Sequence, residues 1–257
     1  MDPPADAGET VGTGALLTGT LQATAVTVWI DPGIIRGWLP SGVRFEDSPP
    51  DPYPLSVVWG AQLNVTAYPG GQRFPFPWRL SYAEIITAVP NLQLDPISGI
   101  DYDGPVTYLP RLYMNSWRAA LLGRAFYGFS KAYARIEATE SAFRAADRHG
   151  HALMSANIVD DSGTPSQGTT CSDLFEQPVV LKAAGRLLAA RFETDLARKP
   201  AQPVSVDFEL RPRLLSYLPA IRRQAPGIDR EPGGGYRFST DWSLRPLAAT
   251  NTESTQN

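Results

Sequence analysis

The sequence predicts a mostly β protein of the α+β class, organised as a barrel or curved sandwich with a few peripheral helices. Segments rich in Val, Thr and aromatic residues recur at short spacing along the chain, as strands do. Few helical patterns interrupt them, and the residues between them include the Pro and Gly of turns. No internal repeat or domain linker stands out, so one domain is expected over residues 15–248.

The first half of the chain is expected to contain four strand regions and two helices. A short helix over residues 33–39 follows an Asp-Pro pair, which favours a helix start, and ends before a proline. A second helix begins at the cap Ser116 and ends at Gly128. The strand regions cover residues 16–30, 54–68, 79–89 and 106–114, with a loop over 69–77 after the second.

The second half is expected to consist of strands. The residues that follow Lys131, up to residue 160, are predicted to form a hairpin that turns around His149 and Gly150. Residues 204–211 alternate between apolar and polar side chains, which is the clearest strand pattern in the chain. Two further strands are expected over 187–199, before a Pro-Ala-Gln-Pro connection, and over 236–247, after a glycine-rich turn at 233–235.

Both ends of the chain are expected to be disordered. Residues 1–14 are small and acidic and contain Pro and Gly, and residues 249–257 are polar without periodicity. The first residues also lack the basic and apolar regions of a signal peptide, so a cytoplasmic location is expected.

The composition excludes several classes of protein. Apolar residues make up 43% and charged residues 19% of the chain, which is enough for a large core. A net charge of −3 and the lack of a basic face argue against a nucleic-acid partner. The longest apolar runs fall short of the roughly 18 residues that a membrane span needs. The single cysteine, Cys171, excludes an internal disulfide and a cysteine-rich metal site.

The chain has two histidines, His149 and His151, which flank Gly150 with Asp147 nearby. We interpret them as the solvated tip of a hairpin rather than as a metal site or a general base. Nucleotide-binding patterns and the HExxH metal motif are missing from the sequence. No metal or organic cofactor is therefore expected.

Two ionisable residues occur in apolar surroundings. Lys131 is one of three lysines beside 20 arginines, and it follows Phe129 and other aromatic residues. An apolar environment lowers the pKa of a lysine, and the free amine can attack a ketone or aldehyde to form an iminium. Glu84 interrupts the apolar run "YAEIITAVP", where it either points outward or faces a polar cavity. By residue type alone, a solvated strand end is the more common interpretation of Lys131.

Several segments resemble, in the same order, those of acetoacetate decarboxylase and its superfamily over roughly residues 16–220. "DPGIIRGWLP" is similar to the early helix of the family, and "YAEIITAVP" to its strand with a tyrosine-x-glutamate motif. "TYLPRLYMNSWRAALLGRAFYGFSKA" is similar to its active-site strand, helix and "GRE…PKK" segment. "LLAARFETDLARKPAQPVSVDFELR" is similar to its late hairpin. The resemblance implies a closed, mainly antiparallel β-barrel with the reactive lysine inside, and family members often form homo-oligomers.

The resemblance assigns roles to a few residues. Lys131 matches the Schiff-base lysine of the family, and Glu84 matches its cavity glutamate. Gly123 and Arg124 match the first two residues of "GRE" and are interpreted as mainly structural. Acetoacetate decarboxylase is itself the familiar example of a lysine activated by a neighbouring cation, so the Schiff-base chemistry is implied by the resemblance.

This chain also departs from the family pattern. Ser130 and Ala132 replace the proline and the second lysine of "PKK", so burial alone would have to depress the pKa of Lys131. Ala125 replaces the glutamate of "GRE", the stretch "TGTLQATAV" has no basic residue to supply the cavity arginine, and a second cavity glutamate is missing near Trp59. A larger, more apolar cavity is therefore expected. Its predicted substrate-binding residues are Phe129, Tyr113, Trp59, Tyr82 and Arg124.

The sequence leaves three hypotheses for the function. The first is a lyase in which Lys131 forms an iminium with a keto acid or other carbonyl substrate and Glu84 acts as general acid or base, in a decarboxylation or an aldol reaction with dehydration. The second is a non-covalent cyclase of a polyketide-like or polyene substrate in natural-product biosynthesis. The third is a non-catalytic protein that binds a small molecule in the same cavity.

Overall fold

The structure is a computed structural model. It describes residues 14–68, 77–95, 100–127, 129–160, 175–183, 186–196, 201–215, 221–225 and 235–247. The order of elements is β1 (Leu17–Ile30), α1 (Pro32–Arg36), β2 (Val43–Arg44), β3 (Tyr53–Ala67), β4 (Leu80–Leu94), β5 (Val106–Tyr108), β6 (Leu112–Met114), α2 (Trp117–Tyr127), β7 (Lys131–Ala138), β8 (Ala142–Asp147), β9 (Ala152–Asp160), β10 (Val179–Ala183), β11 (Arg186–Thr194), β12 (Gln202–Leu210), β13 (Ile221–Ala225) and β14 (Gly235–Pro246). Neither described helix is long and apolar enough to cross a membrane.

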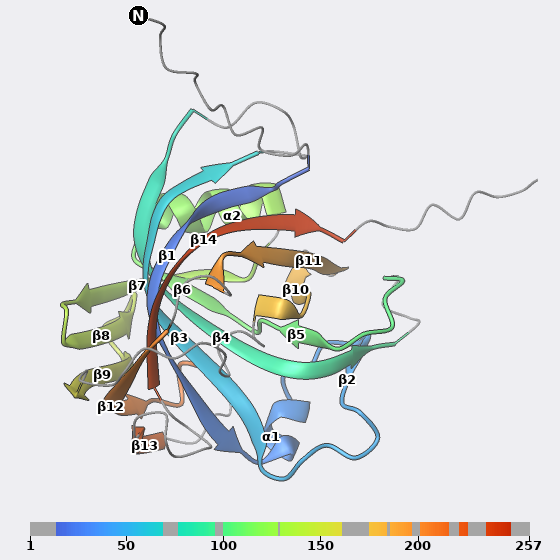
Figure 1. Cartoon of the computed structure of the whole chain (residues 1–257), viewed down its shortest axis with the longest axis horizontal. Coiled ribbons are helices and arrows are strands. Elements are labelled where there is room, and N and C mark those ends of the chain that lie inside the picture. The colour runs from blue at the N-terminus through green and yellow to red at the C-terminus, as the bar shows by residue number, and fades with distance from the viewer. Residues whose placement is uncertain are drawn as a thin grey trace, which may run out of the picture.

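Four long strands form the middle of the molecule. In Figure 1, β1, β3, β4 and β14 run side by side through the centre, in the order β4-β3-β1-β14. Strands β6 to β9 and β12 continue the sheet on one side, and β11, β10 and β5 continue it on the other. Among the described pairings only two, β5 with β10 and β6 with β7, are parallel.

The sheet closes on itself. Residues 202–204 of β12 pair with residues 235–237 of β14, and β5 pairs with β4. These pairings join the two sides of the sheet into a ring, which removes most of the free strand edges. The mostly β architecture that the strand patterns predict is therefore confirmed, and so is the closed, mainly antiparallel barrel that the resemblance implies.

The central strands separate two hydrophobic cores. Along β4, alternate side chains point to opposite faces, so Ile85 and Val89 pack into one core whereas Tyr82 and Ile86 pack into the other. We call the first of these the lower core, which is shared with β8, β9 and β12. We call the second the upper core, which is shared with β10, β11 and α2. Glu84 has the same parity as Tyr82 and therefore faces the upper core.

The local elements follow from the sequence with two corrections. The region 106–114 forms two short strands, β5 and β6, because the stretch from Leu109 to Arg111 contains Pro110, which cannot donate a ladder hydrogen bond. The residues after Lys131 form three strands rather than one hairpin. The turn from Asp147 to His151 lies where it was expected, and a second tight turn joins Thr139 to Ala142. There the Thr139 backbone N–H and hydroxyl donate to the carbonyl of Ala142, and the Ala142 N–H donates to the Thr139 hydroxyl.

Some expected features lie outside the described residues. These are most of the acidic N-terminus, the loop over 69–76, Gly128, the environment of Cys171, two residues of the glycine-rich turn at 233–235, and the C-terminal residues from 248 onward. The short strands β2, β10 and β13 were not expected from the sequence.

Candidate active site

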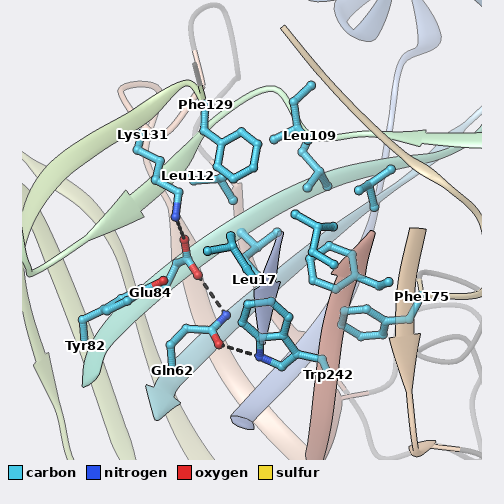
Figure 2. Close-up of a pocket in the computed structure, with 15 residues that line it drawn as sticks. Leu17, Gln62, Tyr82, Glu84, Leu109, Leu112, Phe129, Lys131, Phe175 and Trp242 are labelled. Carbon is cyan, nitrogen blue, oxygen red and sulfur yellow. Dashed lines mark hydrogen bonds and ion pairs between the residues drawn. The ribbon is translucent and has the colours of Figure 1, made fainter. Parts of the chain in front are cut away.

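Lys131 and Glu84 meet in the upper core. Lys131 is the first residue of β7, and the short strand β6 lies between it and Glu84 on β4, because Leu112 pairs with Lys131 and Met114 pairs with Glu84. The Nζ atom of Lys131 lies 3.9 Å from Oε1 of Glu84. Only 7% and 5% of the two side chains are exposed. Figure 2 shows the two groups pointing toward each other across one end of a cavity.

A hydrogen-bonded chain fixes the other oxygen of Glu84. Nε2 of Gln62 donates to Oε2 of Glu84 at 3.0 Å, and Nε1 of Trp242 donates to Oε1 of Gln62 at 3.0 Å (Figure 2). The indole nitrogen of Trp242 can only donate, so the amide of Gln62 must turn its oxygen toward the indole and its NH₂ toward Glu84. Oε2 of Glu84 is therefore an acceptor. When Glu84 carries a proton, that proton belongs on Oε1, the atom that faces Lys131.

Burial shifts the pKa values of both ionisable groups. It lowers the pKa of Lys131 from 10.5, and the negative charge of Glu84 opposes this shift only in part. It raises the pKa of Glu84 from 4.5, against the opposing effects of Lys131 and of the Gln62 hydrogen bond. Both shifts favour the uncharged forms of the two groups, compared with the same groups in water.

Aromatic rings surround the amine. The Nζ atom lies 5.7 Å from the centre of the Tyr82 ring and 5.4 Å from the centre of the Phe129 ring. Such ring faces attract a cation, and they also keep water away from the amine. Burial, together with the charge of Glu84, raises the pKa of Tyr82 well above 10.0, so its hydroxyl remains a hydrogen-bond donor.

Helix α2 holds Lys131 in position. The Nε atom of Arg124 donates to the carbonyl oxygen of Lys131 at 2.6 Å, and the backbone N–H of Phe129 donates to the carbonyl of Gly123 at 3.1 Å. A Cβ atom on Gly123 would lie 2.5 Å from Cδ and 2.9 Å from Cε of Lys131. The lysine stem therefore occupies the space that the missing side chain of Gly123 leaves free.

The cavity beside this pair has a volume of about 50 Å³. Its polar wall consists of Lys131, Glu84, Gln62 and Tyr82, with the indole of Trp242 adjoining it (Figure 2). The rest of its described lining is apolar and comes mainly from β1, β4, β6, β10, β11 and the residues next to them. These apolar residues are Leu17, Ile86, Leu109, Leu112, Phe129, Phe175, Val179, Leu181, Phe192 and Leu244.

The structure brings together some of the predicted site residues and separates others. Tyr82 and Phe129 line the cavity, and Arg124 is an exposed residue that contacts the backbone of Lys131. Trp59 and Tyr113 are not among the described lining residues. Both face the lower core, where the Trp59 ring lies 6.2 Å from that of Phe143. Trp59 lines a separate pocket of about 550 Å³ together with Phe143, and neither Phe129 nor Tyr113 is among its described lining residues.

Position 60 explains why no second carboxylate stands opposite Glu84. Gly60 pairs directly with Glu84 and shares its face of the sheet. A Cβ atom on Gly60 would lie 2.0 Å from the backbone oxygen of Gln22 and 2.6 Å from Cα of Ala23. The close approach of β1 therefore leaves no room for any side chain at this point.

Two polar residues of the site, Gln62 and Trp242, were not predicted from the sequence. Gln62 is a buried amide in an apolar strand, at the same parity as Val58 and Gly60. A polar side chain within an apolar strand is the same kind of signal that pointed to Glu84. Trp242 lies 180 residues away along the chain from Gln62, and nothing in its local sequence indicates the contact.

The two histidines lie at the exposed hairpin tip, as interpreted from the sequence. Asp147 accepts hydrogen bonds from the backbone N–H groups of His149 and His151, and its carboxylate contacts the ring of His151. These interactions hold the pKa of Asp147 at about 2. Among the described residues, no group of three or more His, Cys, Asp or Glu side chains is arranged to hold a metal ion.

No protein-family model matches the sequence, and no curated protein matches it. Solved structures match the fold. The enduracididine biosynthesis enzyme MppR complexed with pyruvate is 16% identical, with a TM-score of 0.61 and coverage of 94% of each chain. Acetoacetate decarboxylase from Legionella pneumophila is 10% identical, with a TM-score of 0.58, over 91% of this chain and 88% of that one.

A third similar structure is an acetoacetate decarboxylase-like enzyme from Sphingomonas wittichii, 14% identical with a TM-score of 0.54, over 96% of this chain and 98% of that one. These similarities span nearly the whole chain. They show that the chain has the acetoacetate decarboxylase-like fold, which is the fold that the sequence resemblance implies.

Proposed function

We propose that this protein is a Schiff-base-forming lyase that acts on a carbonyl substrate through Lys131. The observation that carries the proposal is a buried amine, 3.9 Å from a buried carboxyl group, at the end of a cavity. A lowered pKa increases the fraction of Lys131 that is present as the nucleophilic free amine at a given pH. A neighbouring carboxyl with a raised pKa keeps its proton to higher pH than an exposed carboxyl does, so it can donate that proton to a substrate and take one back.

The reaction begins with attack of the Nζ atom of Lys131 on the carbonyl carbon. The C=O double bond opens, and one proton moves from the nitrogen to the oxygen to give a hydroxyl. Glu84 donates the proton on its Oε1 atom to this hydroxyl, which leaves as water, and a protonated iminium remains. The iminium withdraws electrons from the adjacent carbon. That carbon can then lose a proton to the Glu84 carboxylate, or lose CO₂, to give an enamine. It can also lose a second carbonyl fragment, with the β-hydroxyl proton of that fragment passing to the Glu84 carboxylate. Protonation of the enamine and addition of water release the product and regenerate the amine.

Two further observations support this proposal. The enzymes with the same fold include acetoacetate decarboxylases, and MppR is known in complexes with pyruvate and with the condensation product of pyruvate and imidazole 4-carboxaldehyde. The size of the cavity also favours a small carbonyl compound. A volume of about 50 Å³ accommodates on the order of four water-sized groups, far fewer than a folded polyene contains.

The test is reductive trapping with borohydride followed by peptide mass spectrometry. The protein is incubated with panels of aldehydes, ketones and keto acids and then reduced, which converts an iminium into a stable secondary amine. We expect an adduct on the peptide that contains Lys131, and no such adduct in Lys131→Ala or Lys131→Arg. Lys182, an exposed lysine on β10, serves as the internal control for non-specific labelling.

A Lys131 peptide that stays unmodified with every carbonyl compound would contradict covalent catalysis. Turnover of a substrate by Lys131→Ala at the wild-type rate would contradict it as well. Binding of the same compounds without an adduct would then identify the protein as the binding module of the third hypothesis.

A further inference from the structure

We infer that the Lys131 cavity takes a small uncharged aldehyde or ketone with a short aliphatic chain, rather than a keto acid. This inference rests on the proposed Schiff-base role of Lys131. It concerns the part of the substrate that does not react, and therefore the class of reaction that the site can perform.

The charge of the lining disfavours a carboxylate on the substrate. Among the described residues that line the cavity, Lys131 is the one basic group and Glu84 the one acidic group. When Lys131 becomes a protonated iminium and Glu84 a carboxylate, their charges balance. A carboxylate on the substrate would add a second negative charge that no described lining residue offsets. Both side chains are at most 7% exposed, so water screens this charge poorly.

The supply of hydrogen-bond donors disfavours a carboxylate as well. A buried carboxylate needs several donors to replace its hydration. The indole N–H of Trp242 is already donated to Gln62, and one N–H of the Gln62 amide is donated to Glu84. The hydroxyl of Tyr82 and the second amide N–H of Gln62 remain on the polar wall. Both lie close to Glu84, on the same wall, where a second carboxylate is least favourable.

The opposite wall of the cavity favours an aliphatic chain. Apart from the polar wall, the described lining is aliphatic or aromatic and includes Leu181, Phe192 and Leu244. Figure 2 shows Phe175 on the side of the cavity away from the Lys131–Glu84 pair. Contact between these side chains and the methylene or methyl groups of a substrate removes apolar surface from water, which favours binding. With a cavity volume of about 50 Å³, this wall suits a chain of about three to five carbon atoms.

An uncharged substrate has no carboxylate to lose, so the chemistry of the site is proton transfer and carbon–carbon bond making or breaking at the α carbon. Glu84 removes an α proton from the iminium, and the electron pair of that C–H bond forms the enamine. Return of a proton from Glu84 restores the iminium, and water then releases the carbonyl compound. In D₂O the carboxyl proton of Glu84 exchanges with the solvent before it is returned, so this cycle replaces the α hydrogens of the substrate with deuterium, and the balance needs no other reactant.

The experiment compares two aldehydes of equal chain length, butanal and succinic semialdehyde, which carries a carboxylate in place of the terminal methyl group. Each is trapped on the full-length protein with borohydride, and the adduct on the Lys131 peptide is quantified against that on Lys182. We expect butanal to label Lys131 at least about tenfold faster than succinic semialdehyde, since one unbalanced buried charge costs that much or more. Deuterium exchange at the α carbon of butanal is expected to depend on both Lys131 and Glu84.

The variant Glu84→Gln tests the electrostatic cause directly. Without the Glu84 carboxylate, the iminium itself lacks a counter-charge, and the carboxylate of succinic semialdehyde can supply one. We therefore expect the preference for butanal to shrink or reverse in Glu84→Gln. An unchanged preference in this variant would overturn the electrostatic explanation.

The outcomes separate the inference from the proposed function. Equal or faster labelling of Lys131 by succinic semialdehyde in the wild-type protein would overturn the inference and leave the Schiff base intact. No adduct on Lys131 with either aldehyde, but an adduct with a keto acid, would also overturn the inference and leave the Schiff base intact. No adduct on Lys131 with any compound of the carbonyl panel would overturn the proposed function, and the inference with it. Labelling of Lys182 at the same rate as Lys131 would indicate non-specific reaction and count against both.

Discussion

At the scale of single residues, the site depends on a lysine and a carboxyl group that burial has made less charged than usual. Lys131 stands in a chain that uses arginine for 20 of its 23 basic side chains. Arginine would stay protonated in this position and could not act as a nucleophile. The choice of lysine here is consistent with a role for the free amine.

The pH dependence of Lys131 labelling follows from the direction of its pKa shift. Burial lowers the pKa of Lys131 from 10.5, so the free amine, which alone reacts, is present at lower pH than in an exposed lysine. We expect the rate of reductive alkylation of Lys131 to rise with pH and to level off below 10.5. The measurement is the yield of adduct on the Lys131 peptide across a pH series, with a lysine-containing peptide as reference. A midpoint equal to that of the reference peptide would contradict the shift.

Gln62 is expected to set the acidity of Glu84. Its hydrogen bond lowers the pKa of Glu84, so Gln62→Met should raise that pKa and move the acid limb of α-proton exchange to higher pH. Trp242→Phe keeps the amide of Gln62 but removes the hydrogen bond that orients it. We expect this variant to raise the pKa of Glu84 by less than Gln62→Met does. Gln62→Met also leaves the Trp242 N–H unpaired, at a cost of about 1–3 kcal/mol in the free energy of unfolding. If Gln62→Met lowers the rate of α-proton exchange but leaves the acid limb of its pH profile in place, Gln62 acts only through packing.

At the scale of secondary-structure elements, the junction between α2 and β7 positions the nucleophile. Gly123 provides the space for the lysine stem, and Arg124 holds the backbone oxygen of the same residue. The two residues are adjacent on the helix and act on two different parts of Lys131. Register along β4 and β7 then brings the amine to Glu84.

Gly123→Ala is expected to displace the Lys131 side chain. The added Cβ would lie 2.5 Å from Cδ of the lysine, so the flexible stem must move and Nζ must leave its place beside Glu84. We expect labelling of Lys131 by butanal to fall at least about tenfold, because small displacements of a reacting group cost that much or more. Ala125→Gly, at an exposed position of the same helix, is the control for a change in helix propensity. Wild-type labelling of Lys131 in Gly123→Ala would show that the lysine side chain can place Nζ beside Glu84 in another conformation.

At the scale of the whole molecule, the central sheet of β1, β3, β4 and β14 divides the interior into two cores, and only the upper one contains the ionisable pair. Every residue that a strand presents to one core is denied to the other. The free-energy cost of burying Lys131 and Glu84 is therefore confined to the upper core. We expect the folded chain to be less stable than a variant with apolar residues at these two positions.

The double variant Lys131→Met/Glu84→Gln is expected to be inactive but more stable than the wild-type protein. Replacing a buried ionisable pair with groups of similar volume and no charge is often neutral or stabilising by about 1–4 kcal/mol. Thermal or denaturant unfolding would measure the change. Lys131→Met alone serves as the comparison, because it leaves the Glu84 carboxyl buried without its partner and should be less stable than the double variant. A double variant with a clearly lower free energy of unfolding would show that the pair contributes to stability.

The sequence by itself indicated the β-rich architecture and helix α2 with its cap at Ser116, and it marked Lys131 and Glu84 as ionisable residues in apolar surroundings. These features are local: strand alternation, a capping residue, a glutamate in an apolar run and a lysine at a junction can each be recognised within a few residues. Resemblance to a known family added the closed barrel and the roles of Lys131 and Glu84 as a pair. The two short strands around Pro110 and the turn after Thr139 were missed, because short connections between apolar segments give a weak signal.

Only the tertiary structure decided which side chains share the cavity. Trp59 and Tyr113 are aromatic and close in sequence to site residues, yet their parity along β3 and β6 turns them to the lower core. Gln62 and Trp242 join the site because β3, β1 and β14 lie side by side in one sheet, although the two residues are 180 positions apart. The alternating pattern of a strand predicts that successive side chains face opposite sides of the sheet. Which core each face meets depends on pairings between distant segments, and those exist only in the folded chain.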